Sequence, residues 1–240
     1  MLHDSLGMQL VGEFVGTAMM ILLGDGVCAD MGLKKSKASG ANWVGIAFGW
    51  GMAITFSVYF VKWLTPGFFN PAVAVAMAIS GSFSWSYVLP YIIAEVAGAF
   101  AGAILVWLMF YPHWKETTDQ EAILTSFATA PAIRNYFWNF FAEMLATFVL
   151  VYGLLAFSKS GVDGALNPIL AGSLITAIAF SLGGPTGIAL NPARDFGPRL
   201  AHQVLPIANK GNSDWAYSWV PIVGPFVGGI LAALLFIGLR

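Results

Sequence analysis

The sequence predicts an all-α membrane protein with six transmembrane helices and two half-length helices arranged as an inverted repeat. Three features predict it: long apolar segments, two short apolar segments that follow Gly/Pro breaks, and a matching glutamate in each half. Of the 240 residues, 58% are hydrophobic and 10% are charged, with a mean hydropathy of +0.76. Because soluble domains carry about a quarter charged residues, this composition excludes a large soluble enzyme.

Six apolar segments are long enough to cross the ~30 Å hydrocarbon core of a bilayer, which takes ~20 helical residues. They cover residues 8–29, 42–62, 85–110, 136–157, 167–183 and 215–239, and the fifth is the shortest. Four of them carry glycines spaced four residues apart, namely Gly12/Gly16, Gly45/Gly49, Gly98/Gly102 and Gly224/Gly228. Such pairs let helix backbones approach closely. We expect one tightly packed transmembrane domain over residues 1–240.

Two further apolar stretches are too short to span a membrane. Each begins with Asn-Pro-Ala, at Asn70-Pro71-Ala72 and at Asn191-Pro192-Ala193, after a segment rich in glycine and proline. Ten helical residues extend ~15 Å, which is half of the hydrocarbon core. Each stretch is therefore predicted to be a half-helix that reaches the middle of the bilayer.

The two halves of the chain repeat the same order of features. Glu13 in Gly-Glu-Phe-Val-Gly-Thr matches Glu143 in Ala-Glu-Met-Leu-Ala-Thr, and one half-helix follows each. With three spans per half, the second half must insert upside down. We place the repeats at about residues 8–110 and 136–239. Inverted repeats with interrupted segments point to a site at the membrane midplane.

Asparagine is a favoured helix N-cap and proline a favoured first helical residue, so Asn-Pro predicts a helix start. Asn167-Pro168 at the fifth span is interpreted as ordinary capping, since no glycine-rich segment precedes it. For Asn70 and Asn191, inversion aims both helix N-termini at the bilayer centre. There the partial positive charges and the asparagine amides are expected to form a polar stripe that accepts neutral solutes and opposes protons and cations.

Charged residues inside spans are costly and often functional. Arg194 is predicted to donate to a solute and repel cations, with pairing to Asp195 or snorkelling as the alternative. The other charges expected at depth are Glu13, Glu95 and Glu143. Glu13 and Glu143 are interpreted as acceptors for the loops that lead into the half-helices, and a proton relay is the alternative.

Several classes of function find no support in the sequence. The three histidines are scattered without metal-ligand spacing, and a net charge of −1 does not suggest nucleic acid. No nucleophile–base pair is visible, so we predict neither an enzyme nor a cofactor or metal site.

Together these motifs resemble the major intrinsic protein family, the aquaporins and glycerol facilitators, across nearly the whole chain. Asp195 after Arg194, and Pro221-Ile222 in the last span, are similar to the glycerol-facilitator branch. The resemblance implies an aquaporin-like homotetramer with one pore per subunit in a cell membrane, here a bacterial plasma membrane. It also implies an outer selectivity filter made of Trp50, Ala179, Ile188 and Arg194.

Two positions depart from that branch. Ile188 stands where a second aromatic residue is usual, and Phe68 replaces a histidine that lines the cytoplasmic vestibule. We therefore expect a wider filter and a more apolar vestibule. The predicted function is a passive channel for small uncharged solutes, namely glycerol, water and other polyols or protonated hydroxy acids such as lactic acid. The alternative is a proton-coupled carrier that uses Glu13 and Glu143.

The charge pattern conflicts with the orientation that the resemblance implies. That orientation puts six basic residues outside and three inside: Lys34, Lys35, Lys37, Lys115, Arg134 and Lys210 against Lys62, Lys159 and Arg240. The positive-inside rule favours the reverse. We follow the resemblance, because a pair of motifs is more specific than a tally of charges.

Overall fold

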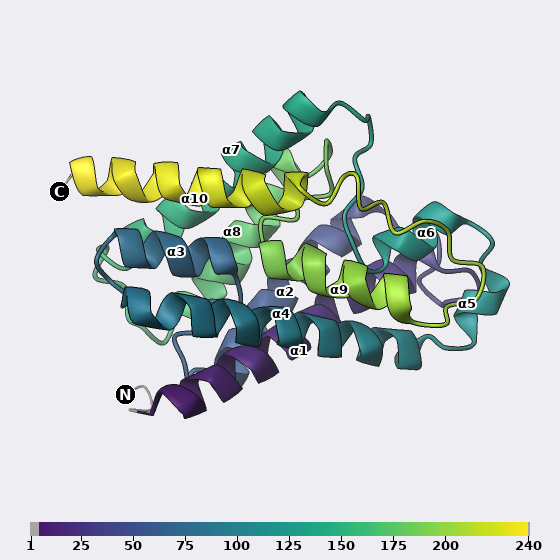
Figure 1. Ribbon diagram of the computed structural model, residues 1–240, viewed down its shortest axis with the longest axis horizontal. Helices are drawn as coiled ribbons and strands as arrows, with labels where there is room; N and C mark the ends of the chain where they lie inside the picture. The colour runs from purple at the N-terminus through teal and green to yellow at the C-terminus, as the bar shows by residue number, and fades with distance from the viewer. Residues whose placement is uncertain (1–4, 240) are drawn as a thin grey trace.

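The computed structural model describes residues 5–239, and all the regular secondary structure within that range is helical (Figure 1). Five helices are long and apolar enough to cross a membrane: α1 (Leu6–Gly32), α2 (Trp43–Val61), α4 (Trp85–Met109), α7 (Tyr136–Phe157) and α10 (Val220–Gly238). The sixth predicted span is α8 (Asn167–Leu182), which has 16 residues. The half-helices are α3 (Pro71–Ile79) and α9 (Pro192–Val204), and α5 (His113–Glu116) and α6 (Gln120–Thr125) are short helices between α4 and α7.

The helix contacts repeat between the two halves. Helix α1 packs along α4 as α7 packs along α10, and α2 packs on α8 where the halves meet. Each half-helix packs on the last helix of the other half, α3 on α10 and α9 on α4. The half-helices lie end to end in the middle of the molecule (Figure 1). The prediction of six spans and two half-helices in an inverted repeat is confirmed.

Two of the four predicted glycine pairs, Gly98/Gly102 and Gly224/Gly228, lie where two helix backbones approach closely. A Cβ on Gly98 or Gly102 would meet backbone carbonyls of α1, and one on Gly228 would meet the carbonyl oxygen of Met144 on α7. Gly224 packs on the same helix, since its Cβ would lie 2.8 Å from the Cβ of Glu143. Glycine is therefore required for the α1–α4 and α7–α10 packing.

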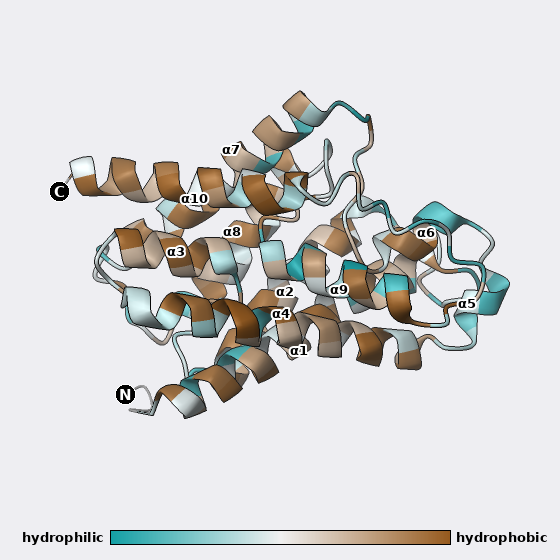
Figure 2. Cartoon of the chain, viewed as in Figure 1, coloured by the Kyte–Doolittle hydropathy of each residue, from teal (hydrophilic) through white to brown (hydrophobic). Residues whose placement is uncertain are grey.

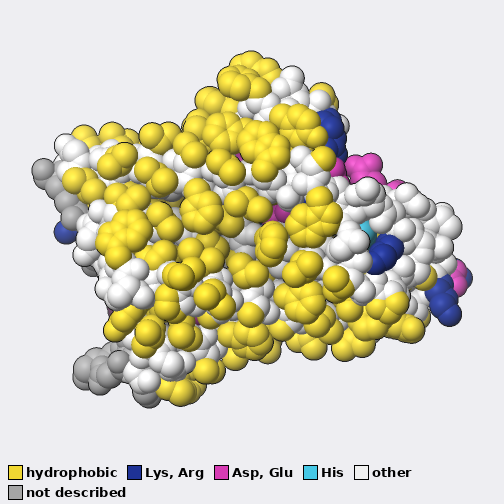
Figure 3. Space-filling view, viewed as in Figure 1, with side chains coloured by type: hydrophobic (Ala, Val, Ile, Leu, Met, Phe, Trp, Pro, Cys, Tyr) yellow, Lys and Arg dark blue, Asp and Glu magenta, His cyan; other side chains and the backbone are white. Residues whose placement is uncertain are grey.

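The outer surface of the bundle is apolar over the long helices and more polar at the end that carries α5 and α6 (Figures 2 and 3). Figure 3 shows hydrophobic side chains covering most of the visible face, and Figure 2 shows hydrophilic residues gathered around α5 and α6. Large side chains on this surface are strongly exposed, such as Met109 at 72%, Leu89 at 65% and Phe137 at 65%. Exposed apolar area of this extent fits contact with lipid rather than with water.

One expectation about helix starts is wrong. Asn167 does not cap α8: it is the first helical residue, the cap position belongs to Leu166, and no side chain caps this end. A turn precedes the helix, in which the Leu166 amide donates to the Asp163 carbonyl at 2.8 Å. Since that turn already carries the chain into helical geometry, Asn167 falls one position too late to cap.

Candidate functional site: a polar stripe in an apolar cavity

A cavity of about 570 Å³ lies between the two halves of the molecule. Its walls come from α1, α2, α3, α7 and α8, from the first turn of α9, and from the two extended segments that lead into the half-helices. Asn70, Asn191 and Arg194 supply polar groups to the wall, whereas most of the remaining lining is apolar. A largely apolar cavity with few polar groups is the usual form of a small-solute site.

The two half-helices begin with the same local geometry. Asn70 and Asn191 both have φ −155° and ψ 110°, and each is followed by a proline in the first turn. The Oδ1 atom of Asn70 accepts from the Ala72 amide at 3.0 Å, and that of Asn191 accepts from the Ala193 amide at 3.0 Å. The asparagine oxygen is thereby committed to capping, which turns the amide nitrogen away from its own helix.

Each asparagine also bonds to the opposite half of the molecule. The Nδ2 atom of Asn70 donates to the Leu190 carbonyl at 2.8 Å, and that of Asn191 donates to the Phe69 carbonyl at 2.6 Å. Phe69 and Leu190 are the residues that directly precede the two asparagines. An amide NH₂ has two donors, so this crossing pair uses one N–H of each asparagine and leaves the other for a solute.

Two buried glutamates hold the extended segments. Glu13 on α1 accepts from the backbone amides of Gly67, Phe68 and Phe69 at 3.2, 3.2 and 2.8 Å. Glu143 on α7 accepts from the amides of Ala189 and Leu190, both at 2.9 Å. Neither glutamate lines the cavity. These hydrogen bonds are the contacts expected of loop support, because backbone amides at membrane depth need acceptors.

The backbone of the segments before the half-helices is partly left-handed. Phe69 has φ 50°, Leu190 has φ 56° and Ile188 has φ 45°, whereas Gly67 occupies the position equivalent to Ile188 with φ 74°. Positive φ is a true outlier for a β-branched residue such as isoleucine. The strain at Ile188 persists because the surrounding hydrogen bonds fix this segment, and such strain is typical of functional positions.

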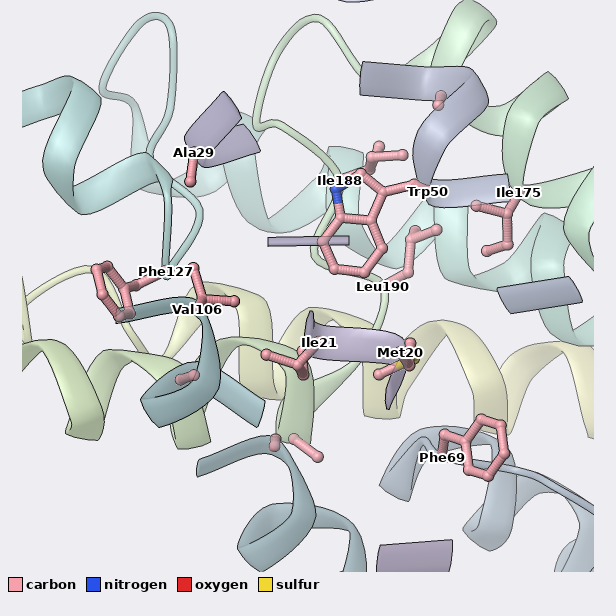
Figure 4. Close-up of a cluster of buried hydrophobic side chains, with 14 of the residues drawn as sticks. Met20, Ile21, Ala29, Trp50, Phe69, Val106, Phe127, Ile175, Ile188 and Leu190 are labelled. Carbon is pink, nitrogen blue, oxygen red and sulfur yellow. The ribbon is translucent and has the colours of Figure 1, made fainter. Parts of the chain in front are cut away.

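Three of the four predicted filter residues line the cavity. Figure 4 shows the Trp50 ring beside Ile188 and Leu190, with Met20 and Ile175 nearby, and all five contribute to the wall. Arg194 lines it too, and its guanidinium carbon lies 4.3 Å from the centre of the Trp50 ring.

Ala179 is buried outside the described cavity wall. Its carbonyl oxygen accepts a hydrogen bond from Trp43 Nε1 at 2.9 Å. Its place in the filter stays a prediction.

Arg194 has partners other than the one considered from the sequence. Its Nη1 atom donates to the Phe127 carbonyl at 3.1 Å and lies 3.1 Å from Oδ1 of Asp25 on α1. The alternative of a pair with Asp195 is wrong, because Asp195 is bound to Arg199 at 2.7 and 2.9 Å. A contact with the next residue along a helix is geometrically poor, whereas Arg199 lies one turn further on the same face.

Phe68 lies at the other end of the cavity and belongs to an aromatic cluster. Its ring centre is 5.0 Å from that of Phe83, in an edge-to-face arrangement, and 5.9 Å from that of Tyr91. The predicted apolar vestibule residue thus lines the cavity while packing against α4.

Sequence reasoning missed Asp25 as a charge at membrane depth. It lies within the predicted first span and is fully buried. The signal that could have found it is simple, since any carboxylate inside a predicted span needs a named partner. Among residues 5–239 there is no group of three or more His, Cys, Asp and Glu side chains that could hold a metal ion.

The family model described as major intrinsic protein matches residues 3–236. "Glycerol uptake facilitator protein 3" of Lactiplantibacillus plantarum is 60% identical over 98% of each chain. The "D/L-lactic acid transporter" of the same organism is 43% identical over 94% of each chain. The X-ray structure of the aquaglyceroporin from Plasmodium falciparum superimposes with a TM-score of 0.85 at 27% identity, covering 97% of this chain and 96% of that one.

Proposed function

Because this chain belongs to the major intrinsic protein family, we propose that it is a passive channel for small uncharged solutes, chiefly glycerol and water. One observation carries the proposal: two asparagine-capped half-helices meet end to end against a mostly apolar cavity. Family membership confirms the prediction of a multi-pass membrane transport protein rather than an enzyme.

The polar stripe performs two tasks in this mechanism. The free N–H groups of Asn70 and Asn191 donate to a solute hydroxyl, while the apolar wall contacts its carbon atoms. The N-terminal ends of α3 and α9 each carry about half a positive charge at the same place, which opposes cations and protons. Because the stripe replaces the water shell of a neutral polyol but not that of an ion, it selects against charge.

Selectivity among neutral solutes is assigned to the filter of Trp50, Ala179, Ile188 and Arg194. Ile188 is smaller than the aromatic residue that the family resemblance implies, so the filter admits solutes somewhat broader than glycerol. Protonated lactic acid is one of them, and a relative at 43% identity is named for that solute. Phe68 makes the vestibule at the other end of the cavity apolar.

We assign passive transport rather than proton-coupled transport. A carrier that used Glu13 and Glu143 would need these carboxylates to face the permeation path. Both are instead engaged by backbone amides and lie away from the cavity wall.

We further propose the orientation that the resemblance implies, with the α5–α6 end outside, in a bacterial plasma membrane. Repeat boundaries near residues 8–110 and 136–239 and a homotetramer with one pore per subunit belong to the same proposal. The exposed apolar helix faces are compatible with subunit contacts as well as with lipid.

Stopped-flow light scattering on proteoliposomes tests the transport mechanism. We expect glycerol and water flux well above that of empty liposomes, following the solute gradient and unchanged by a protonophore. Flux that collapses on addition of the protonophore would support the carrier instead.

Ile188→Phe tests the filter in the same assay. We expect slower flux of glycerol and lactic acid than of water, because the ring narrows the cavity beside Trp50. Ile93→Phe is the matched control, since Ile93 is 61% exposed on α4 and does not line the cavity. Equal slowing of all solutes by Ile188→Phe would remove Ile188 from the filter.

A further inference from the structure

Asp25 is the one buried carboxylate that contacts the filter arginine in the described part of the chain. It is fully buried, its side chain does not line the cavity, and its Oδ1 atom lies 3.1 Å from Arg194 Nη1. Apart from this ionic contact, neither Asp25 oxygen has a hydrogen-bond partner among residues 5–239. A buried carboxylate without other donors is stable as an anion only if the nearby cation compensates it.

The same turn of α1 also supports the other main filter side chain. A Cβ on Gly24 would meet the Trp50 ring, so the ring lies flat against the backbone of α1. The Trp50 Nε1 atom lies 3.4 Å from the sulfur of Cys28, to which it donates. Residues 24–28 therefore form a single wall behind the filter, in contact with Trp50 through Gly24 and Cys28 and with Arg194 through Asp25.

The other acidic group near Arg194 is already neutralised. Asp195 accepts from two guanidinium nitrogens of Arg199 and from the backbone and hydroxyl of Thr129. Arg194 thus depends on Asp25 for its counter-charge. Because Arg194 reaches the cavity and Asp25 lies behind it, the pair presents a dipole whose positive end faces the permeating solute.

We propose that Asp25 is a specificity-determining residue, which fixes the position of Arg194 and compensates its charge so that the filter rejects cations without attracting anions. An uncompensated guanidinium in a low-dielectric pore would concentrate small anions at the constriction. With Asp25 in place, the long-range field of the pair cancels, while the N–H groups of Arg194 still donate to neutral hydroxyl and carboxyl groups. This inference rests on the proposed filter role of Arg194.

The test is Asp25→Asn in the full-length protein, reconstituted in proteoliposomes. The amide keeps the size of the side chain and an oxygen that can accept from Arg194, so it removes charge with little change in shape. We expect permeability to nitrate and to ionised lactate to rise about tenfold or more, since one full charge is exposed in a low-dielectric site. Glycerol flux should stay within about threefold of the flux through the unaltered protein, because a neutral solute carries no net charge for the exposed guanidinium to attract.

Asp30→Asn is the matched control. Asp30 is another aspartate of α1, is bonded to Ser36 rather than to the filter, and does not line the cavity. We expect it to leave anion permeability unchanged. The unaltered protein, measured in parallel, tests the channel itself, so a failure of glycerol transport there is distinguishable from a failure of the present inference.

A double variant keeps the inference testable if Asp25→Asn does not fold, because breaking one side of a buried pair is strongly destabilising. Asp25→Asn with Arg194→Gln removes both charges and should restore folding and low anion permeability. Folded Asp25→Asn with unchanged anion permeability would overturn the inference. So would loss of folding in Asp25→Asn that the double variant does not restore, since the defect would then be independent of charge.

Discussion

Removing the carboxylate of Glu143 should destabilise the protein in proportion to the backbone amides left without an acceptor. Glu143 is 1% exposed and accepts from Ala189 and Leu190, both at 2.9 Å. A buried N–H that loses its acceptor costs about 1–3 kcal/mol. Glu143→Ala strands two amides and should cost roughly 2–6 kcal/mol. Glu143→Gln keeps one carbonyl acceptor and should cost roughly 1–3 kcal/mol.

Thermal unfolding of the purified protein in detergent measures this order. For a chain of this length, 1 kcal/mol corresponds to roughly 2–4 °C in the unfolding midpoint. We expect the midpoint to fall in the order native, Glu143→Gln, Glu143→Ala. Glu121→Gln serves as control, because Glu121 is exposed on α6 and should leave the midpoint unchanged.

Glycerol flux in liposomes should fall in the same order, since the Leu190 carbonyl that receives Asn70 belongs to the segment held by Glu143. The reasoning is refuted in either of two ways. Equal midpoints for the glutamine and alanine variants would show that the two amides do not depend on this acceptor. A glutamine variant with the native midpoint but no glycerol flux would assign the carboxyl to transport itself, as a proton carrier requires.

Three other predictions concern the barrier, the packing and the solute. Arg194→Ala should raise cation leak in a liposome conductance assay, because it leaves the Asp25 carboxylate uncompensated beside the cavity. Arg134→Ala removes an exposed arginine and should leave the cation leak unchanged. Gly228→Ala should lower the yield of folded protein in size-exclusion chromatography, because the added Cβ would meet the Met144 carbonyl. Gly26→Ala is the control and should leave the yield unchanged, because a Cβ at Gly26 would lie in open space. Lactic acid flux should rise as pH falls, because the neutral fraction of the acid increases, and flux independent of pH would contradict transport of the neutral form.

The spans and the half-helices were predictable because their signals are local. Hydrophobic length fixes the spans, and Asn-Pro fixes where α3 and α9 begin. The same dipeptide misled at Asn167, where a preceding turn moves the helix start by one residue. A capping motif therefore predicts that a helix starts nearby, whereas the residue that caps depends on the conformation of the chain before it.

The contacts of the filter were less predictable, because they join residues far apart in the sequence. Asp25 and Arg194 meet only after α1 and α9 pack into one bundle, and the Phe127 carbonyl reaches Arg194 from a loop with no motif. The sequence did indicate the matching positions of Glu13 and Glu143, because the internal repeat supplied a second copy for comparison. Asp25 has no such copy, and a hydropathy pattern treats it as one tolerated charge in a long apolar span.

The crossing hydrogen bonds between the half-helices explain why the two Asn-Pro-Ala turns must act as one unit. Asn70 donates to the residue before Asn191, and Asn191 donates to the residue before Asn70. Each turn therefore fixes the backbone segment of the opposite half, and the amides of that segment are held by the glutamate of its own half. A displacement at either turn is transmitted to the other through two short bonds. The polar stripe thus has a fixed geometry, and adaptation to different neutral solutes is left to the filter side chains around it.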